Sequence, residues 1–182
     1  MIISKVSLHK INTSTHTNCV KNRARSMCML LNEREKLEIE FLKEQEATCI
    51  ERYVRHAEEA KDQELKNLFH IIEKEERKHY DSLTQVLNGT VPECDTNDNM
   101  GKNYQPKATY AKSEKCENKE HDCYLATDSI GAEKLLSSEY NDGIFVYNNS
   151  DVRKLLADIQ IEEQNHADMM WKYKVANGMV DN

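Results

Sequence analysis

The chain has 182 residues, and its 25 basic and 32 acidic side chains give a formal charge of −7 at neutral pH. This length suits one domain, and the acidic balance argues against a nucleic-acid-binding groove. The longest apolar run near the N-terminus, residues 27–31, is far shorter than the ~18 residues that a membrane-spanning helix needs. We therefore expect no nucleic-acid partner and no membrane span.

Residues 1–32 differ in composition from the rest of the chain, because they contain lysine and arginine but no acidic residue. We expect them to form a basic, disordered N-terminal tail that takes no part in the fold. Two alternatives stay open. The segment can be an organellar transit peptide, or translated sequence upstream of a true start at Met27 or Met29.

The large apolar residues are concentrated in two blocks. Residues 37–87 contain 14 of the Leu, Ile, Val and Phe residues and residues 125–175 contain 13, whereas residues 88–124 contain only Val91. The chain has only five glycines and two prolines, and good helix formers are common in both blocks. We therefore expect two helical blocks joined by a polar connection.

The first block, residues 33–88, has the pattern of a helical hairpin. Apolar residues at steps of three and four predict one buried face on each helix, and Asp62 is placed to cap the second helix. The pair Asn88-Gly89 provides a stop. The expected inward residues are Ile39, Leu42, Glu46, Cys49, Ile50, Tyr53, Ala57 and Ala60 on the first helix, and Leu65, Leu68, Phe69, Ile72, Glu76, His79, Leu83, Val86 and Leu87 on the second.

The connection, residues 89–124, is long and polar and holds three of the six cysteines. Without a secretory signal we expect these thiols to be reduced. The connection has enough donors for a zinc ion, but their irregular spacing favours solvated loop residues. These donors are Cys94, Cys116, His121 and Cys123.

The second block, residues 125–178, repeats the scheme of the first. A stripe on its first helix is followed by the turn 148–150, and Ser150 is the expected cap of its second helix. Asn177-Gly178 closes that helix. The expected inward residues are Ile130, Glu133, Leu136, Tyr140, Ile144 and Tyr147, followed by Val152, Leu155, Leu156, Ile159, Glu163, His166, Met169, Met170 and Tyr173.

An internal repeat relates the two blocks at a constant offset of 87 positions, without a gap. Each hairpin alone leaves an apolar stripe uncovered, so we expect the two to pack together as an all-α four-helix bundle. The long connection suits an end-to-end crossover between the second and third helices. The main repeated pairs are Glu46/Glu133, Tyr53/Tyr140, Glu76/Glu163 and His79/His166.

The bundle interior would contain four glutamates and two histidines. Unpaired buried carboxylates are costly and repel one another, so a neutralising partner is needed. Two divalent cations balance four carboxylates, and oxygen ligands with two imidazoles suit iron or manganese. We therefore predict a site for two Fe or Mn ions, because one Glu from each of two helices with Glu-x-x-His from the other two is a known di-metal ligand set. The predicted ligands are Glu46, Glu76, His79, Glu133, Glu163 and His166.

Several neighbouring residues have a structural interpretation as well as a chemical one. Tyr53 and Tyr140 lie two turns after their glutamates, where a phenol can bond a ligand carboxylate, be oxidised, or pack in the core, and packing is favoured. Cys49 is as often a small core residue as a redox partner. We expect the remaining carboxylates of the Glu-x-x-His helices to lie on a solvated face. These are Glu73, Glu75 and Glu162.

The paired Glu-x6-Tyr and Glu-x-x-His motifs resemble the ferritin-like superfamily, which includes ferritins and rubrerythrins, over about residues 37–89 and 125–178. More narrowly, residues 159–166 (IQIEEQNH) and 176–179 (ANGM) are similar to the F-type spore coat and related ferritin-like proteins of endospore-forming Firmicutes. Residues 57–62 and 75–79 are similar to the first hairpin of those proteins. The resemblance implies a ferritin-like bundle, often dimeric, associated with the spore coat or with oxidative-stress defence.

Two departures limit what this resemblance implies. Rubrerythrins carry a Cys-x-x-Cys module and an additional glutamate one turn after the third-helix ligand, but this chain lacks the module and has Leu136 at that position. A rubrerythrin-type peroxidase is therefore not expected. The fifth helix of ferritin cages is not found either, which argues against iron storage.

The resulting hypothesis is a di-metal protein that reacts with dioxygen or peroxide, or binds iron, as an oxidoreductase of the peroxidase, catalase or ferroxidase type. The superfamily implies that Glu76 and Glu163 bridge the metals, with Glu46 and Glu133 as outer carboxylates. The alternative is a structural coat or interaction protein with a non-catalytic or decayed site. We expect a homodimer or a coat assembly, located in the bacterial cytoplasm or in the spore coat.

Overall fold

The computed structural model describes residues 30–94 and 99–180. The predicted tail, residues 1–32, lies outside the described residues except for its last three positions. Every regular element in the described ranges is a helix, which confirms the predicted all-α class. The helices are α2 (Glu33–Glu59), α3 (Gln63–Leu87), α4 (Met100–Asn103), α5 (Glu117–Ile144) and α6 (Ser150–Ala176).

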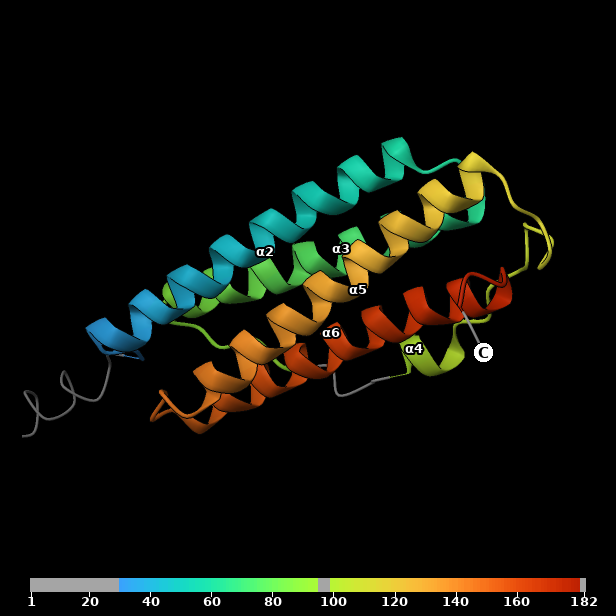
Figure 1. Cartoon of the computed structure of the whole chain (residues 1–182). Coiled ribbons are helices and arrows are strands. Elements are labelled where there is room, and N and C mark those ends of the chain that lie inside the picture. Colours follow the sequence, from blue (N-terminus) through green and yellow to red (C-terminus); the bar gives the residue numbers. More distant parts are fainter. Residues whose placement is uncertain (1–29, 95–98, 181–182) are drawn as a thin grey trace, which may run out of the picture. The chain divides into compact units, whose positions relative to one another are not determined.

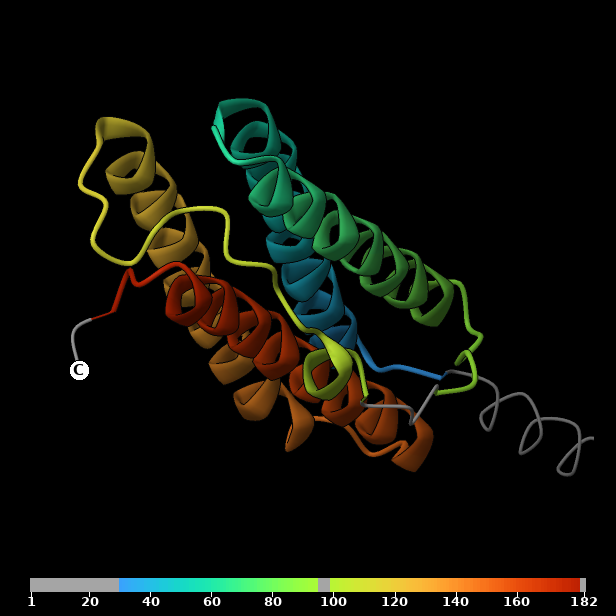
Figure 2. The same cartoon turned by 90° about the vertical axis from the view of Figure 1, so that its right-hand side faces the viewer.

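The four long helices form two hairpins, α2 with α3 and α5 with α6 (Figure 1). The hairpins contact each other through α2 with α5 and α3 with α6, and we call these four helices the bundle. Because α3 and α5 run in the same direction, the chain returns along the bundle before α5 begins (Figure 1). On this return α4 packs on α6, and residues 104–116 pass over the end of the bundle where α6 finishes (Figure 2).

Capping side chains set where the helices begin. Asn32 caps α2 in a capping box, in which it and Glu35 each accept a hydrogen bond from the other's backbone N–H. Asp62 caps α3 as predicted. The cap of α6 is Asn149 rather than the predicted Ser150, because the Asn149 side-chain oxygen accepts from the backbone N–H groups one turn ahead.

Two glycines end the hairpins where the sequence predicts a stop. Gly89 and Gly178 have φ values of 87° and 60°, the left-handed conformation that favours glycine after a helix. Each follows an asparagine C-cap, Asn88 after α3 and Asn177 after α6. The repeated Asn-Gly pairs therefore have the same structural role in both hairpins.

The start of α5 differs from the prediction, because the helix begins at Glu117 instead of residue 125. The added two turns carry no apolar stripe, so periodicity does not reveal them. They are stabilised by acidic residues in the first turn, which face the positive end of the helix dipole, and by Lys119, whose ammonium group donates to two backbone carbonyls.

The core consists of the stripes that the sequence predicts, with a few differences. In α5 the buried positions are Ala126 and Ser129 rather than Ile130, which is only half-buried. Ser129 is satisfied there, because its hydroxyl donates to the Leu125 carbonyl. The other predicted core residues that are only half-buried are Ile50, Leu87 and Ile144.

Two carboxylates at equivalent positions link the hairpins, because each accepts hydrogen bonds from the turn of the other hairpin. Glu35 of α2 accepts from the backbone N–H of Asn148, in the turn between α5 and α6, at 2.8 Å. Asp122 of α5 accepts from the backbone N–H groups of Lys61 and Asp62, in the turn between α2 and α3, both at 2.8 Å. Positions 35 and 122 are also related by the offset of 87 residues, so the repeat includes these reciprocal contacts.

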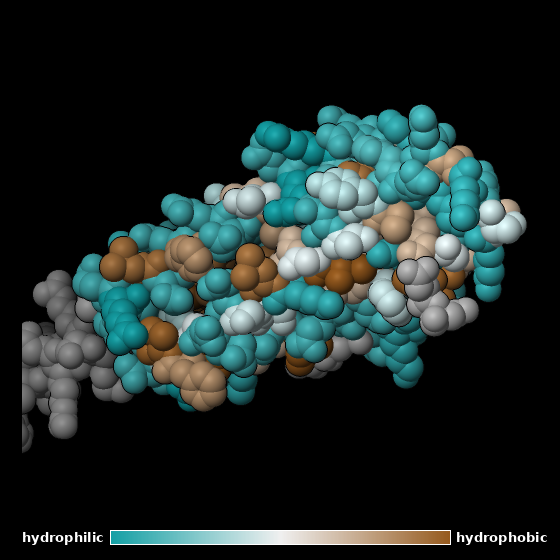
Figure 3. Space-filling view, in the orientation of Figure 1, coloured by the Kyte–Doolittle hydropathy of each residue, from teal (hydrophilic) through white to brown (hydrophobic). Residues whose placement is uncertain are grey.

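The surface fits a water-exposed bundle. Hydrophilic residues predominate on the face that Figure 3 shows, with single apolar residues between them. Exposed large apolar side chains include Leu37, Leu135 and Phe145. No helix among the described residues has an apolar stretch long enough to cross a membrane.

We predict that Asp122→Ala lowers the free energy of unfolding by about 3 kcal/mol, because it leaves the buried backbone N–H of Asp62 and the partly buried one of Lys61 without their acceptor. Asp122 is fully buried and also accepts from the Tyr110 hydroxyl. Urea unfolding followed by circular dichroism measures the change. Asp142→Ala, at an exposed position of the same helix, is the control and should change stability by about 0.5 kcal/mol or less. Equal effects of the two substitutions would contradict the assigned role of Asp122.

Candidate metal centre

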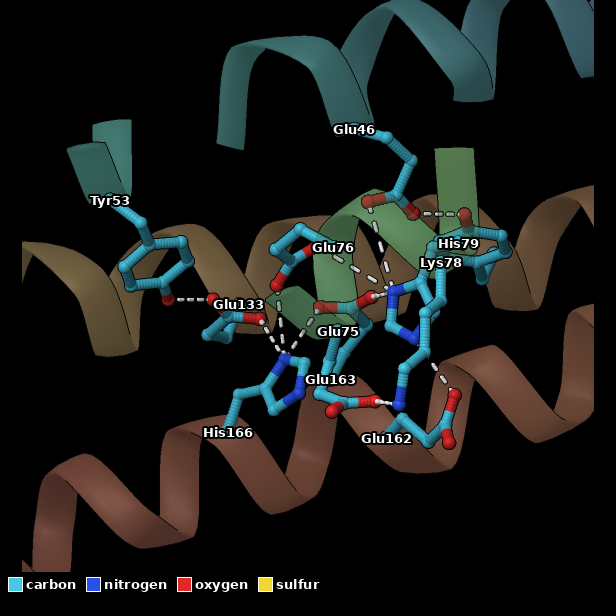
Figure 4. Close-up of polar contacts among 11 residues, drawn as sticks. Glu46, Tyr53, Glu75, Glu76, Lys78, His79, Glu133, Glu162, Glu163 and His166 are labelled. Carbon is cyan, nitrogen blue, oxygen red and sulfur yellow. Dashed lines mark hydrogen bonds and ion pairs between the residues drawn. The ribbon is translucent and has the colours of Figure 1, made fainter. Parts of the chain in front are cut away.

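The six residues predicted as metal ligands lie together in the middle of the bundle (Figure 4). Each helix of the bundle contributes its share: α2 and α5 one glutamate each, and α3 and α6 one Glu-x-x-His pair each. The i, i+3 spacing brings glutamate and histidine to adjacent turns of one helical face. None of the six residues is more than 2% exposed: Glu46, Glu76, His79, Glu133, Glu163 and His166.

The donor atoms fall into two overlapping groups. Glu46 and His79 belong to one group and Glu133 and His166 to the other, whereas Glu76 and Glu163 are common to both. Within each group one donor atom from every residue lies within 4.8 Å of the others. The arrangement thus has two halves that share two carboxylates.

The histidines of the two halves make reciprocal contacts across the bundle. His79 Nδ1 lies 3.0 Å from Glu163 Oε1, and His166 Nδ1 lies 3.0 Å from Glu76 Oε1. The two imidazole rings are stacked, with centroids 5.8 Å apart and an interplanar angle of 22°. Each histidine therefore faces the shared carboxylate of the opposite hairpin.

The two buried tyrosines hold the outer carboxylates. The Tyr53 hydroxyl donates to Glu133 Oε1, and the Tyr140 hydroxyl donates to Glu46 Oε1. Both phenols are fully buried, and each contact joins one hairpin to the other. Of the roles considered for these tyrosines, hydrogen bonding to a ligand carboxylate is the one seen here, and it accompanies packing in the core.

The atoms that face the centre make no hydrogen bond within the part of the chain that the structure describes. Buried polar atoms are nearly always hydrogen-bonded, and one that is not costs about 1–3 kcal/mol or more. These eight atoms are Glu46 Oε2, both carboxylate oxygens of Glu76 and of Glu163, Glu133 Oε2, and Nδ1 of His79 and His166. These eight atoms lie together around one centre, so the cluster is the candidate site of the described chain.

Three carboxylates of the centre have shifted pKa values, two of them raised and one lowered. Burial and the neighbouring charge of Glu76 raise the pKa of Glu46 to about 8, and burial among carboxylates raises the pKa of Glu163 well above its usual value. Burial also opposes ionisation of Glu76, but contacts with His166 and His79 outweigh it and lower the Glu76 pKa. For both histidines, contacts with carboxylates overcome burial and raise the pKa well above 6.5. Without metal, the centre therefore retains protons at neutral pH.

One residue of the site lies where the sequence does not predict it. Glu162, expected on a solvated face, has its Oε2 2.7 Å from His79 Nε2. The equivalent Glu75 pairs with Lys78 of its own helix at 2.6 Å. No pattern in the sequence could distinguish the two, because the difference depends on a contact between α3 and α6.

The cysteines do not add to the centre. Cys49 is buried beside it, and burial together with the nearby carboxylates raises its thiol pKa, which argues against a reactive thiolate. Within the described residues, neither donor group includes a cysteine or His121. Cys94 lines a pocket between α3 and α6, whereas Cys116 and Cys123 line a different pocket near Gly178. The structure therefore does not unite the donors considered for zinc.

The donor set fits a pair of hard divalent cations. Four carboxylates and two imidazoles are ligands that iron and manganese accept, and two divalent ions would balance the four negative charges. Both shared carboxylates face the centre without a hydrogen bond in the described residues, and each has one oxygen 3.0 Å from a histidine of the opposite hairpin. The residues present therefore match a di-metal site in number, chemistry and position.

Comparison with known proteins gives one match. Residues 121–182 match the family model described as Coat F domain, which agrees with the resemblance of the second hairpin to F-type spore coat proteins. The matched segment contains Glu133, Glu163 and His166, and the other three candidate ligands lie outside it. No curated protein and no solved structure matches the chain.

Proposed function

We propose that this chain is a ferritin-like, spore-coat-associated protein that binds two iron or manganese ions between its hairpins and reacts with dioxygen or peroxide. The observation that carries the proposal is the set of eight buried, unsatisfied oxygen and nitrogen atoms around one centre. Two divalent cations would satisfy these atoms together, whereas protons alone would leave several lone pairs without a partner.

The proposed ligand roles follow from the two overlapping donor groups. Glu76 and Glu163 would serve both ions, because both groups include them. Glu46 with His79 would complete one half, and Glu133 with His166 the other. This assignment agrees with the roles that the superfamily resemblance implies.

Bound iron or manganese would supply Lewis acidity and electrons for the reduction of dioxygen or peroxide. The chain's own groups prepare the site for this chemistry. Tyr53 and Tyr140 hold one oxygen of each outer carboxylate and so orient the other oxygen toward the centre. The apolar side chains around the centre exclude bulk water, which strengthens electrostatic interactions within it.

The association with the spore coat rests on the Coat F domain match and on the resemblance of the second hairpin. We expect the chain in the coat fraction of spores from a bacterium that encodes it. Fractionation of purified spores, followed by antibody detection, measures this directly. Recovery from the spore core alone would contradict the proposed location.

We predict about two Fe or Mn ions per purified chain, and the loss of both in the double variant Glu76→Gln with Glu163→Gln. The amides keep the size of the side chains but remove the shared charges. The matched control is Asp81→Asn with Asp168→Asn, at equivalent positions on the same two helices and away from the centre. Metal content is measured by mass spectrometry on protein prepared without a His tag.

The control variant should bind as much metal as the unmodified chain. Unchanged metal content in the Glu76/Glu163 variant would refute the assigned ligands. A folded, unmodified chain that binds neither metal after reconstitution would refute the di-metal proposal and leave the structural coat role.

We also predict that metal binding releases protons and strengthens as the pH rises toward 8. Glu46, with a pKa of about 8, is protonated below that pH, and both histidines are favoured in their charged form, so a metal has to displace these protons. Each released proton makes the apparent affinity rise about tenfold per pH unit. Manganese binding followed by electron paramagnetic resonance at pH 6, 7 and 8 measures the dependence. An affinity that is constant over this range would contradict it.

A further inference from the structure

The two halves of the centre differ on their outer sides, although the repeat makes their ligands equivalent. His79 connects the centre to the outside: its Nδ1 faces Glu163, and its Nε2 lies 2.7 Å from Glu162, whose side chain is 30% exposed. In the described part of the chain, His166 contacts carboxylates through its Nδ1, which faces Glu76, Glu133 and Glu163 of the centre. Among the described residues, the His79 half is therefore the one whose histidine contacts a partly exposed carboxylate.

A pocket of about 190 Å³ lies beside His79, between α3 and α6. His79 and Glu162 form part of its wall, together with Ser82, Glu93, Cys94 and Asp158. Lys78 also lines the pocket, and its charge is paired with that of Glu75 at 2.6 Å. The buried imidazole thus separates this pocket from the centre, with one ring nitrogen on each side.

The equivalent region of α6, beside His166, is covered by α4. At Asn165, which is equivalent to Lys78, the backbone of α4 packs so closely that a Cβ on Gly101 would lie 2.6 Å from Asn165 Oδ1. The Lys172 ammonium group of α6 donates to the Gly101 carbonyl and holds α4 in place. The connection between the hairpins therefore covers α6 next to His166 and leaves the His79 pocket accessible within the described residues.

We propose that divalent cations reach the centre through this pocket and that Glu162 binds them on the way in. This inference rests on the proposed function, because it assumes that the centre takes up metal. Carboxylates on the pocket wall attract cations, and Glu162 is the one that also contacts a ligand of the centre. The first ion to arrive enters the half formed by Glu46 and His79.

The test measures the rate of metal uptake separately from the amount bound. Metal-free protein is mixed with Co²⁺ in a stopped-flow instrument, and the visible absorption of bound cobalt reports uptake. We expect Glu162→Gln to slow uptake at saturating Co²⁺ about tenfold and, through the lost contact with His79, to weaken the affinity, and Glu162→Asp to restore most of the rate. Ser82→Arg, which places bulk and positive charge in the pocket, should slow uptake as well.

Glu73→Gln is the matched control, because it removes one negative charge from α3 at a position that does not line the pocket. It should take up cobalt at the rate of the unmodified chain. Uptake at the unmodified rate in both Glu162→Gln and Ser82→Arg would overturn the entry route while leaving the di-metal site intact. An unmodified chain that binds no cobalt would overturn the proposed function, and the entry route with it.

Discussion

Burying four carboxylates in the core of one small bundle is the constraint on which the rest of the structure depends. A cluster of this kind is unfavourable unless cations, protons or hydrogen bonds compensate the charge. Among the described residues, hydrogen bonds to these carboxylates come from the outer side, where Tyr53 and Tyr140 each hold one carboxylate oxygen. The inner atoms make no hydrogen bond in the described part of the chain, and their contacts are ion pairs between each histidine and the shared carboxylate of the opposite hairpin.

The contacts that support the centre join one hairpin to the other. Tyr53 and Glu133 belong to different hairpins, as do Tyr140 and Glu46. The histidines likewise face the shared carboxylates of the opposite hairpin. The approximate twofold relation between the hairpins therefore applies to the chemistry of the site as well as to the helices. It is broken by the connection, which packs closely on α6 at Asn165 but lines a pocket with Glu93 and Cys94 at the equivalent Lys78.

Much of this arrangement could be predicted from the sequence, because the repeat places four glutamates and two histidines at helical spacing within apolar stripes. The convergence of those six residues follows from the same periodicity that forms the core. The cross-hairpin partners of Glu35 and Glu162 could not be predicted, because they depend on which turn or helix of the other hairpin lies opposite. The early start of α5 could not be predicted from the sequence either. Its first two turns have no apolar stripe, and acidic first-turn residues and the contacts of Lys119 with backbone carbonyls stabilise them.

The reciprocal capping of the turns by Glu35 and Asp122 has a consequence for how the chain folds. Each hairpin has backbone N–H groups at its own turn that bond to a carboxylate of the other hairpin, across 113 and 60 positions of sequence. Neither hairpin is thus complete as an independent folding unit, and docking has to occur before either turn is fully bonded. Such long-range contacts slow folding but couple the two halves, so loss of one hairpin's structure is expected to propagate to the other in a single cooperative transition.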